Sequence, residues 1–146
     1  MSTVVSKRRI NNFKPLLDAF NLVKYTLEIT GNEKIFLPKY KALTDDIIHT
    51  AEFIFTKAWE ANNIRIKTYD DARFRCQLQT EAILKCKNLL SLIDISYNLF
   101  HLRGKRIVYW GSLVMDVRDS IIGWRNHEVK KHDLRPLYIK EDFNAV

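Results

Sequence analysis

Four segments of this chain repeat apolar residues at the three- and four-residue steps of an amphipathic helix. The segments are residues 15–30, 43–63, 69–100 and 106–130. Only four Gly and three Pro interrupt the 146 residues, which disfavours sandwiches, barrels and Rossmann folds with their glycine loops. Short connections at 64–68 and 101–105 make successive helices neighbours that run in opposite directions. The pattern therefore predicts an all-α fold, an antiparallel up-down-up-down four-helix bundle.

Each segment has a predicted core stripe. The stripes are Leu16, Phe20, Val23 and Leu27; Leu43, Ile47, Ala51, Ile54, Ala58 and Ala61; Phe74, Leu78, Ala82, Cys86, Leu89, Ile93, Tyr97 and Phe100; and Ile107, Trp110, Val114, Val117, Ile121 and Trp124. Gly111 and Gly123 interrupt the last helix, either as close approaches to another helix or subunit or as tolerated defects.

The chain divides into a basic N-terminal extension (1–14), one bundle (15–130) and a C-terminal tail (131–146).

Cys76 and Cys86 are ten residues apart on one predicted helix, about 15 Å along its axis, which is too far for a disulfide. Residues 1–10 lack the apolar region of a secretion signal. Asp94 interrupts the most apolar stretch, so no run reaches the length of a membrane span. We expect a cytoplasmic protein with no membrane contact.

The sequence offers little catalytic or metal chemistry. His127 and His132 are five residues apart, so their rings diverge by about 140° instead of sharing the face that a zinc helix requires. Asp45 and Asp46 point about 100° apart and occupy a helix start, where the dipole favours acids. We expect no enzyme, no metal, no cofactor and no small-molecule substrate.

The net charge of +7 is unevenly distributed: residues 1–14 carry +4, residues 15–63 carry −2, residues 64–100 carry +2 and residues 101–146 carry +3. In the predicted bundle this places cations at both ends of a nearly neutral middle. Such clusters suit polyanions, because each neutralised phosphate releases counterions. A plain solvated surface is the alternative reading. The candidate phosphate contacts are Arg103, Lys105, Arg106, Arg125, Lys130 and Lys131, supported by Lys39 and Lys41, with Tyr25, Tyr40, Tyr69 and Tyr109 available to stack on unpaired bases.

Several short runs, in this order, carry a family resemblance. They are Thr30-Gly31-Asn32-Glu33-Lys34, Phe36-Leu37-Pro38-Lys39-Tyr40, Glu60-Ala61-Asn62, Leu89-Leu90, Ile93-Asp94-Ile95, Lys105-Arg106, Tyr109-Trp110, Asp116-Val117-Arg118 and Gly123-Trp124-Arg125. Over residues 15–130 the chain resembles the four-helix-bundle accessory variability determinants of diversity-generating retroelements. That family is related to bundles encoded in intervening sequences of ribosomal RNA genes.

The resemblance implies a homopentameric barrel that binds the element's reverse transcriptase and its template RNA. Such a subunit supports mutagenic complementary-DNA synthesis and retrohoming, while the catalytic carboxylates and metals belong to the reverse transcriptase. Apolar residues off the main stripes, Phe55, Trp59, Tyr109 and Met115, suit assembly or a broad core equally. Two alternatives stay open: an intervening-sequence type bundle without a reverse-transcriptase partner, and a structural oligomer whose basic ends serve solubility.

Overall fold

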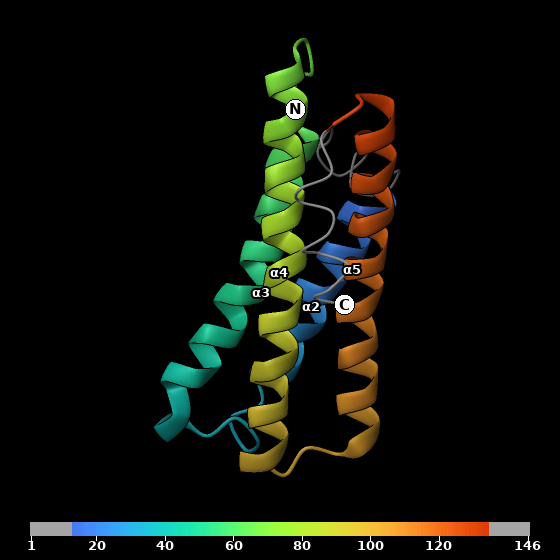
Figure 1. Ribbon diagram of the computed structural model, residues 1–146. Coiled ribbons are helices and arrows are strands. Elements are labelled where there is room, and N and C mark those ends of the chain that lie inside the picture. The colour runs from blue at the N-terminus through green and yellow to red at the C-terminus, as the bar shows by residue number, and fades with distance from the viewer. Residues whose placement is uncertain (1–12, 135–146) are drawn as a thin grey trace.

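Four long helices account for most of the computed structural model, which describes residues 13–134 (Figure 1). They are α2 (Lys14–Thr30), α3 (Lys41–Asn62), α4 (Tyr69–Leu99) and α5 (Gly104–Lys131), and a short 3-10 turn, η1 (Pro38–Tyr40), precedes α3. No strand occurs between residues 13 and 134. The predicted all-α four-helix bundle is confirmed at this level, with helix boundaries within two residues of those expected.

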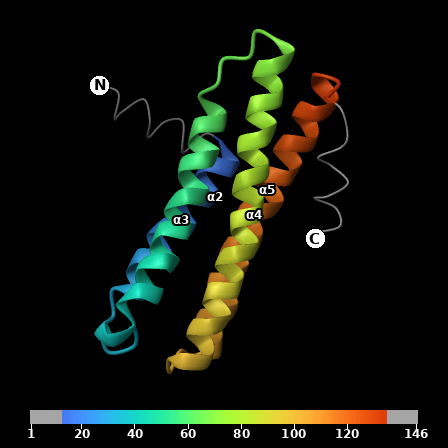
Figure 2. The ribbon, with the colours of Figure 1, turned by 60° about the vertical axis from the view of Figure 1, so that its left-hand side comes forward.

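Each long helix packs on the next one along the chain, and α5 closes the bundle against α2 (Figures 1 and 2). Two contacts show how α2 meets α5. The ring centroids of Phe13, just before α2, and Trp124 of α5 are 4.9 Å apart, and the Trp110 indole of α5 donates a hydrogen bond to the Thr26 hydroxyl of α2 at 3.0 Å. The beginning of α2 therefore lies beside the end of α5, and the end of α2 beside the beginning of α5.

The sequence explains where α4 begins. The Thr68 hydroxyl accepts from the backbone of Asp71, and the Asp71 carboxylate accepts from the Thr68 backbone, which is a reciprocal capping box. The backbone amide of Lys67 also donates to the Asp71 carboxylate, and this hydrogen bond, with those of Thr68, lowers the pKa of Asp71. Two acids in the first turn also complement the helix dipole. Thr68 therefore ends the short 63–68 connection as the N-cap, and the 31-residue helix α4 begins at the next residue, Tyr69.

Most of the core is one cluster that all four helices share, and a smaller cluster of Ala72, Cys76 and Leu134 lies apart from it. Its largest fully buried apolar side chains are Leu16, Leu22, Ile47, Ile54, Leu89, Trp110, Ile121, Val114 and Val117. The predicted stripe of α5 is confirmed from Trp110 to Ile121, and that of α3 from Ile47 to Ala61. Cys76 and Cys86 are buried and unpaired, as their spacing requires, and burial raises the pKa of the Cys86 thiol to about 12.

Two predicted stripes are partly wrong. Phe20 and Leu27 of α2 are 42% and 48% exposed, and Phe74 and Tyr97 of α4 are also exposed. The buried face of α2 instead follows Leu16, Ala19, Leu22, Thr26 and Ile29. Thr26 can lie in the core because the Trp110 indole donates to its hydroxyl, and apolar periodicity alone does not register a satisfied polar residue.

Gly111 and Gly123, the two glycines in the interior of α5, stand in open space among the described residues. A Cβ at Gly111 or Gly123 would meet no atom within 4 Å. Close approach to another helix within residues 13–134 is therefore not the reason for either glycine. No described helix combines the length and apolar character needed to cross a bilayer.

Candidate nucleic-acid interface

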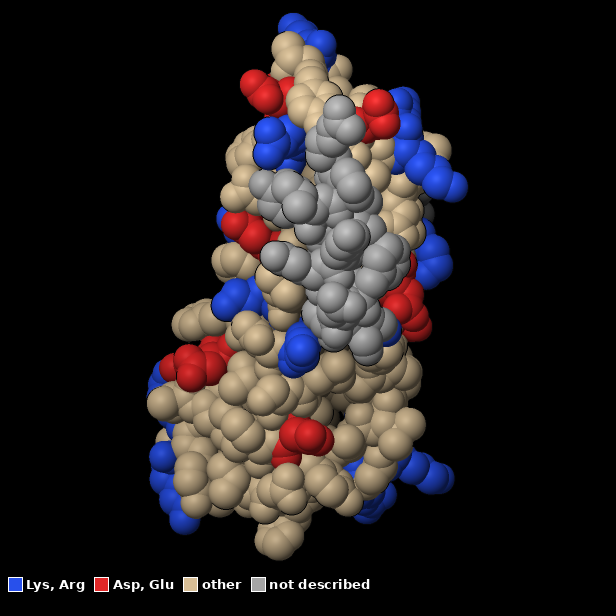
Figure 3. Space-filling view, in the orientation of Figure 1, with Lys and Arg blue, Asp and Glu red and all other residues tan. Residues whose placement is uncertain are grey.

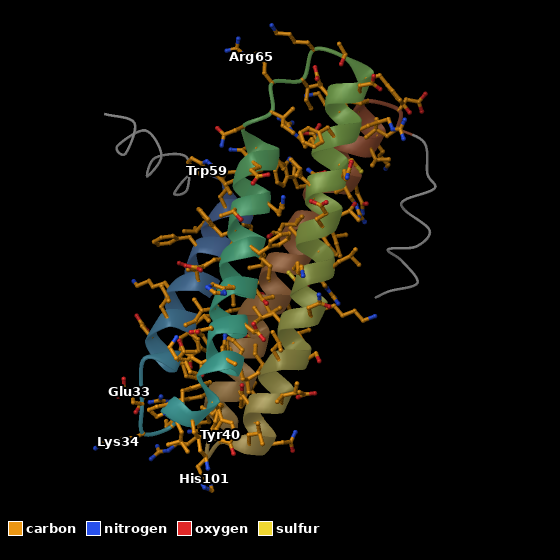
Figure 4. The ribbon with its side chains drawn as sticks, turned by 90° about the vertical axis from the view of Figure 1, so that its left-hand side faces the viewer. Glu33, Lys34, Tyr40, Trp59, Arg65 and His101 are labelled. Atoms are coloured by element: carbon orange, nitrogen blue, oxygen red, sulfur yellow. The ribbon has the colours of Figure 1, made fainter. Side chains whose placement is uncertain are left out.

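One end of the bundle is formed by residues 31–42 and 100–109, which we call the loop end. The buried Phe36 anchors the loop, with its ring 4.8 Å from Phe100 and 6.1 Å from Trp110. Tyr40 adds a contact to Phe100 at 5.5 Å. Three aromatic contacts thus hold the loop before α3 against the junction between α4 and α5. Figure 4 shows Glu33, Lys34, Tyr40 and His101 together at this end and Arg65 at the other.

The side chain and carbonyl of Asn32 shape the tip of this loop. The Asn32 carbonyl accepts from the backbone amides of Ile35 and Phe36, and the Asn32 side chain accepts from the amide of Lys34. This turn directs Phe36 into the core and leaves Lys34 in solvent. The same turn therefore anchors the loop and presents a cation.

The loop end concentrates exposed positive charge. Its basic residues are Lys34, Lys39, Lys41, Arg103, Lys105 and Arg106, all exposed, and Glu33 is its one acid. Lys41 pairs with Asp45 at 2.7 Å, whereas the other five form no ion pair with any residue from 13 to 134. In Figure 3, Lys and Arg side chains gather at both lower corners of the molecule, below α3 and below α5.

The start of α5 adds to this positive field. Its N-cap is Arg103, whose side chain forms no cap hydrogen bond, and its first turn contains no acid. The positive end of the helix dipole therefore points into the same region as Lys105 and Arg106. Together these features suit the phosphates of a polyanion better than a cationic or neutral ligand.

The structure does not bring all the predicted contacts together. Lys39, Lys41, Arg103, Lys105 and Arg106 share the loop end. Lys130 and Lys131 are exposed at the last turn of α5, roughly one helix length of 40 Å away. Around them the described basic residues are accompanied by four acids, Asp70, Asp71, Glu128 and Asp133. The sequence also predicts Lys7, Arg8, Arg9 and Arg135 at that end of the bundle, but these four residues lie outside the described part of the chain.

Arg125 must be removed from the predicted phosphate contacts. Its side chain is 0% exposed, and its Nη1 donates to the Thr80 hydroxyl at 3.2 Å. Burial lowers the pKa of Arg125. The buried position of Arg125 is predictable from the sequence, because Arg125 and Glu128 continue the three- and four-residue steps of the buried α5 stripe beyond Ile121.

A second internal arginine, Arg75, joins three parts of the chain opposite the loop end. Its Nε donates to the Ala61 carbonyl at 2.9 Å, its Nη2 to the Ile64 carbonyl, and its Nη1 to Glu128 at 2.6 Å. His132 lies 3.1 Å from the other carboxylate oxygen of Glu128. We call these residues the Arg75 clamp. Burial raises the pKa of Glu128, but the hydrogen bond and charge of Arg75, with His132, hold it below its ordinary value.

The described residues contain no cluster of three or more His, Cys, Asp or Glu side chains able to hold a metal ion. His132, one of the two histidines near the end of α5, contacts Glu128 at 3.1 Å. Between α3 and α4 lies an open groove of about 500 Å³ whose lining includes His49, Phe53 and Lys85. No nucleophile and base are paired in it by a hydrogen bond.

Comparison of the chain with protein-family models, with curated proteins and with solved structures finds no match.

Proposed function

We propose that this protein is a non-catalytic RNA-binding bundle whose loop end grips the phosphate backbone. The observation that carries the proposal is the set of six exposed cations against one acid at the loop end. Two of the six are arginines, whose forked guanidinium groups can contact phosphate oxygens in pairs. The aromatic contacts of Phe36 and Tyr40 hold the two halves of the cluster in place, so binding needs little prior ordering.

The cellular setting that we propose is a diversity-generating retroelement. The bundle would serve as the accessory subunit that binds the reverse transcriptase and its template RNA during mutagenic retrohoming. The order of the short runs described above supports this setting, as does the four-helix architecture. In this proposal the helices alternate up and down, and five copies form a cytoplasmic barrel that needs no cofactor, membrane or small-molecule substrate.

A matched pair of triple variants tests the RNA interface. The loop-end variant is Arg103→Gln, Lys105→Gln and Arg106→Gln, and the control, in the middle of the bundle, is Lys57→Gln, Lys85→Gln and Lys87→Gln. Both lower the net charge of +7 by three, so a non-specific charge effect would weaken both equally. We expect the loop-end variant alone to lose about tenfold or more in RNA affinity at 0.1 M salt, measured by fluorescence anisotropy. Equal losses would contradict a localised interface.

A structural oligomer is the second candidate, and the outer face of α4 favours it. Phe74, Leu84, Ile95 and Leu99 are large apolar side chains exposed along one helix. Their number exceeds what a monomeric bundle needs to expose, and a partner surface would bury them. Light scattering tests this candidate: a mass of five chains supports the barrel, and a monomer mass contradicts both the barrel and the structural oligomer.

A further inference from the structure

A shallow groove between α2 and α5 lies directly beside the loop end. Its volume is about 300 Å³, and it is lined by Asn21, Lys24, Tyr25, Glu28, Tyr109 and Leu113. Lys24 and Glu28 form no ion pair with each other or with any other residue that the structure describes. The groove therefore combines tyrosine rings from both helices with uncommitted polar groups from α2.

Two tyrosines form the aromatic part of the groove. The rings of Tyr25 and Tyr109 meet edge to face, with centroids 4.9 Å apart and an interplanar angle of 81°. Tyr25 is half-buried and also contacts the Trp110 ring, so its position is fixed from the core side. Tyr109 is 51% exposed. The perpendicular arrangement holds the Tyr109 ring in place and leaves about half of its side chain open to a flat ligand.

The cations of the loop end lie next to this ring. Arg106 and Lys105 precede Tyr109 by three and four residues on α5, so both are its neighbours on the helix surface. Helical side chains lean toward the N-terminus, which brings the Tyr109 ring toward these two residues. Arg106 is also close to Tyr25: burial raises the pKa of Tyr25, and the Arg106 charge opposes that rise.

We propose that this groove is a subsite for one unpaired nucleotide, with its base stacked on Tyr109 and its phosphate held by Lys105 and Arg106. The base edge then faces the Asn21 amide, which both donates and accepts, and the charged groups of Lys24 and Glu28. A base inside a duplex stacks on its neighbours and cannot cover Tyr109. The subsite therefore makes the interface selective for single-stranded over double-stranded RNA, an inference that rests on the proposed RNA-binding function.

The test compares a single-stranded RNA 12-mer with its duplex in fluorescence anisotropy. Tyr109→Ala is expected to weaken binding of the single strand by about 5- to 100-fold, the loss typical of one base stack, and to leave duplex affinity unchanged. Tyr109→Phe keeps the ring and should retain wild-type affinity. Tyr97→Ala is the matched control, because Tyr97 is a tyrosine of similar exposure (47%) on α4, outside the groove. Circular dichroism spectra of all variants verify that the helices are intact.

A second readout locates the stack. The fluorescence of 2-aminopurine placed in the 12-mer should be quenched on binding to the wild-type protein and to Tyr109→Phe, and not on binding to Tyr109→Ala. Undiminished single-strand affinity in Tyr109→Ala, with binding still sensitive to the loop-end triple variant, would overturn the subsite and leave the proposed function standing. Absence of RNA binding by the wild-type protein would overturn both.

Discussion

The Arg75 clamp allows the sharpest prediction about stability. Replacing Arg75 with Ala removes the hydrogen-bond donors of the Ala61 and Ile64 carbonyls and leaves the Glu128 carboxylate, only 8% exposed, without its guanidinium. Breaking one partner of such a pair costs about 3–5 kcal/mol, because the remaining charge stays buried. For a chain of this length the loss corresponds to a fall in Tm of about 10–15 °C.

Urea unfolding followed by circular dichroism measures the effect, with Arg73→Ala as the control. Arg73 is an exposed arginine two residues earlier on the same helix, and we expect its loss to cost less than about 1 kcal/mol. Replacing both partners, as Arg75→Met with Glu128→Leu, should recover much of the stability lost in Arg75→Ala, since no unpaired charge remains. If Arg75→Ala and Arg73→Ala destabilise the protein equally, the clamp does not hold this end together.

Glu128, Gly123 and Arg125, all on α5, give three further predictions. The pKa of Glu128 is held below its ordinary value of 4.5, so its ion pair stabilises the folded state fully above pH 4.5. The free energy of unfolding of the wild-type protein should therefore exceed that of Glu128→Gln above this pH, and the difference should shrink as the pH falls further, as measured by unfolding at a series of acid pH values. Gly123→Ala should raise the free energy of unfolding by about 0.5–1 kcal/mol, because the added Cβ meets open space; a decrease would reveal another surface packed there. Arg125→Ala should lower it by about 2–3 kcal/mol and leave RNA affinity unchanged within about twofold, which separates a core arginine from a phosphate contact.

Apolar periodicity predicted the four helices and most of the core, and its errors have identifiable causes. On α5 the stripe from Trp110 to Ile121 is correct because it consists of large apolar residues. On α2 the buried face passes through Thr26, whose hydroxyl is satisfied by Trp110 on another helix. A contact between residues 84 positions apart is not visible in local spacing.

The candidate site is likewise only partly predictable from the sequence. The connection lengths bring the 31–42 loop beside the start of α5, and with it five of the eight predicted contacts. Charge alone, however, does not distinguish a surface arginine from an internal one. Arg125 was placed with the surface cations, although its spacing from Ile121 puts it on the buried face. Nor does the sequence mark Arg75 as an internal residue, because its carbonyl partners, Ala61 and Ile64, become apparent only in the folded chain.

The salt dependence of RNA binding by the wild-type protein tests the loop-end interface most directly. If all six loop-end cations contact phosphates, the logarithm of the association constant should fall against the logarithm of salt concentration with a slope of about −4 for a single strand. The triple variant of Arg103, Lys105 and Arg106 should reduce the steepness by about 2. A flat salt response, or no RNA binding at low salt, would contradict the proposal that this basic end binds RNA.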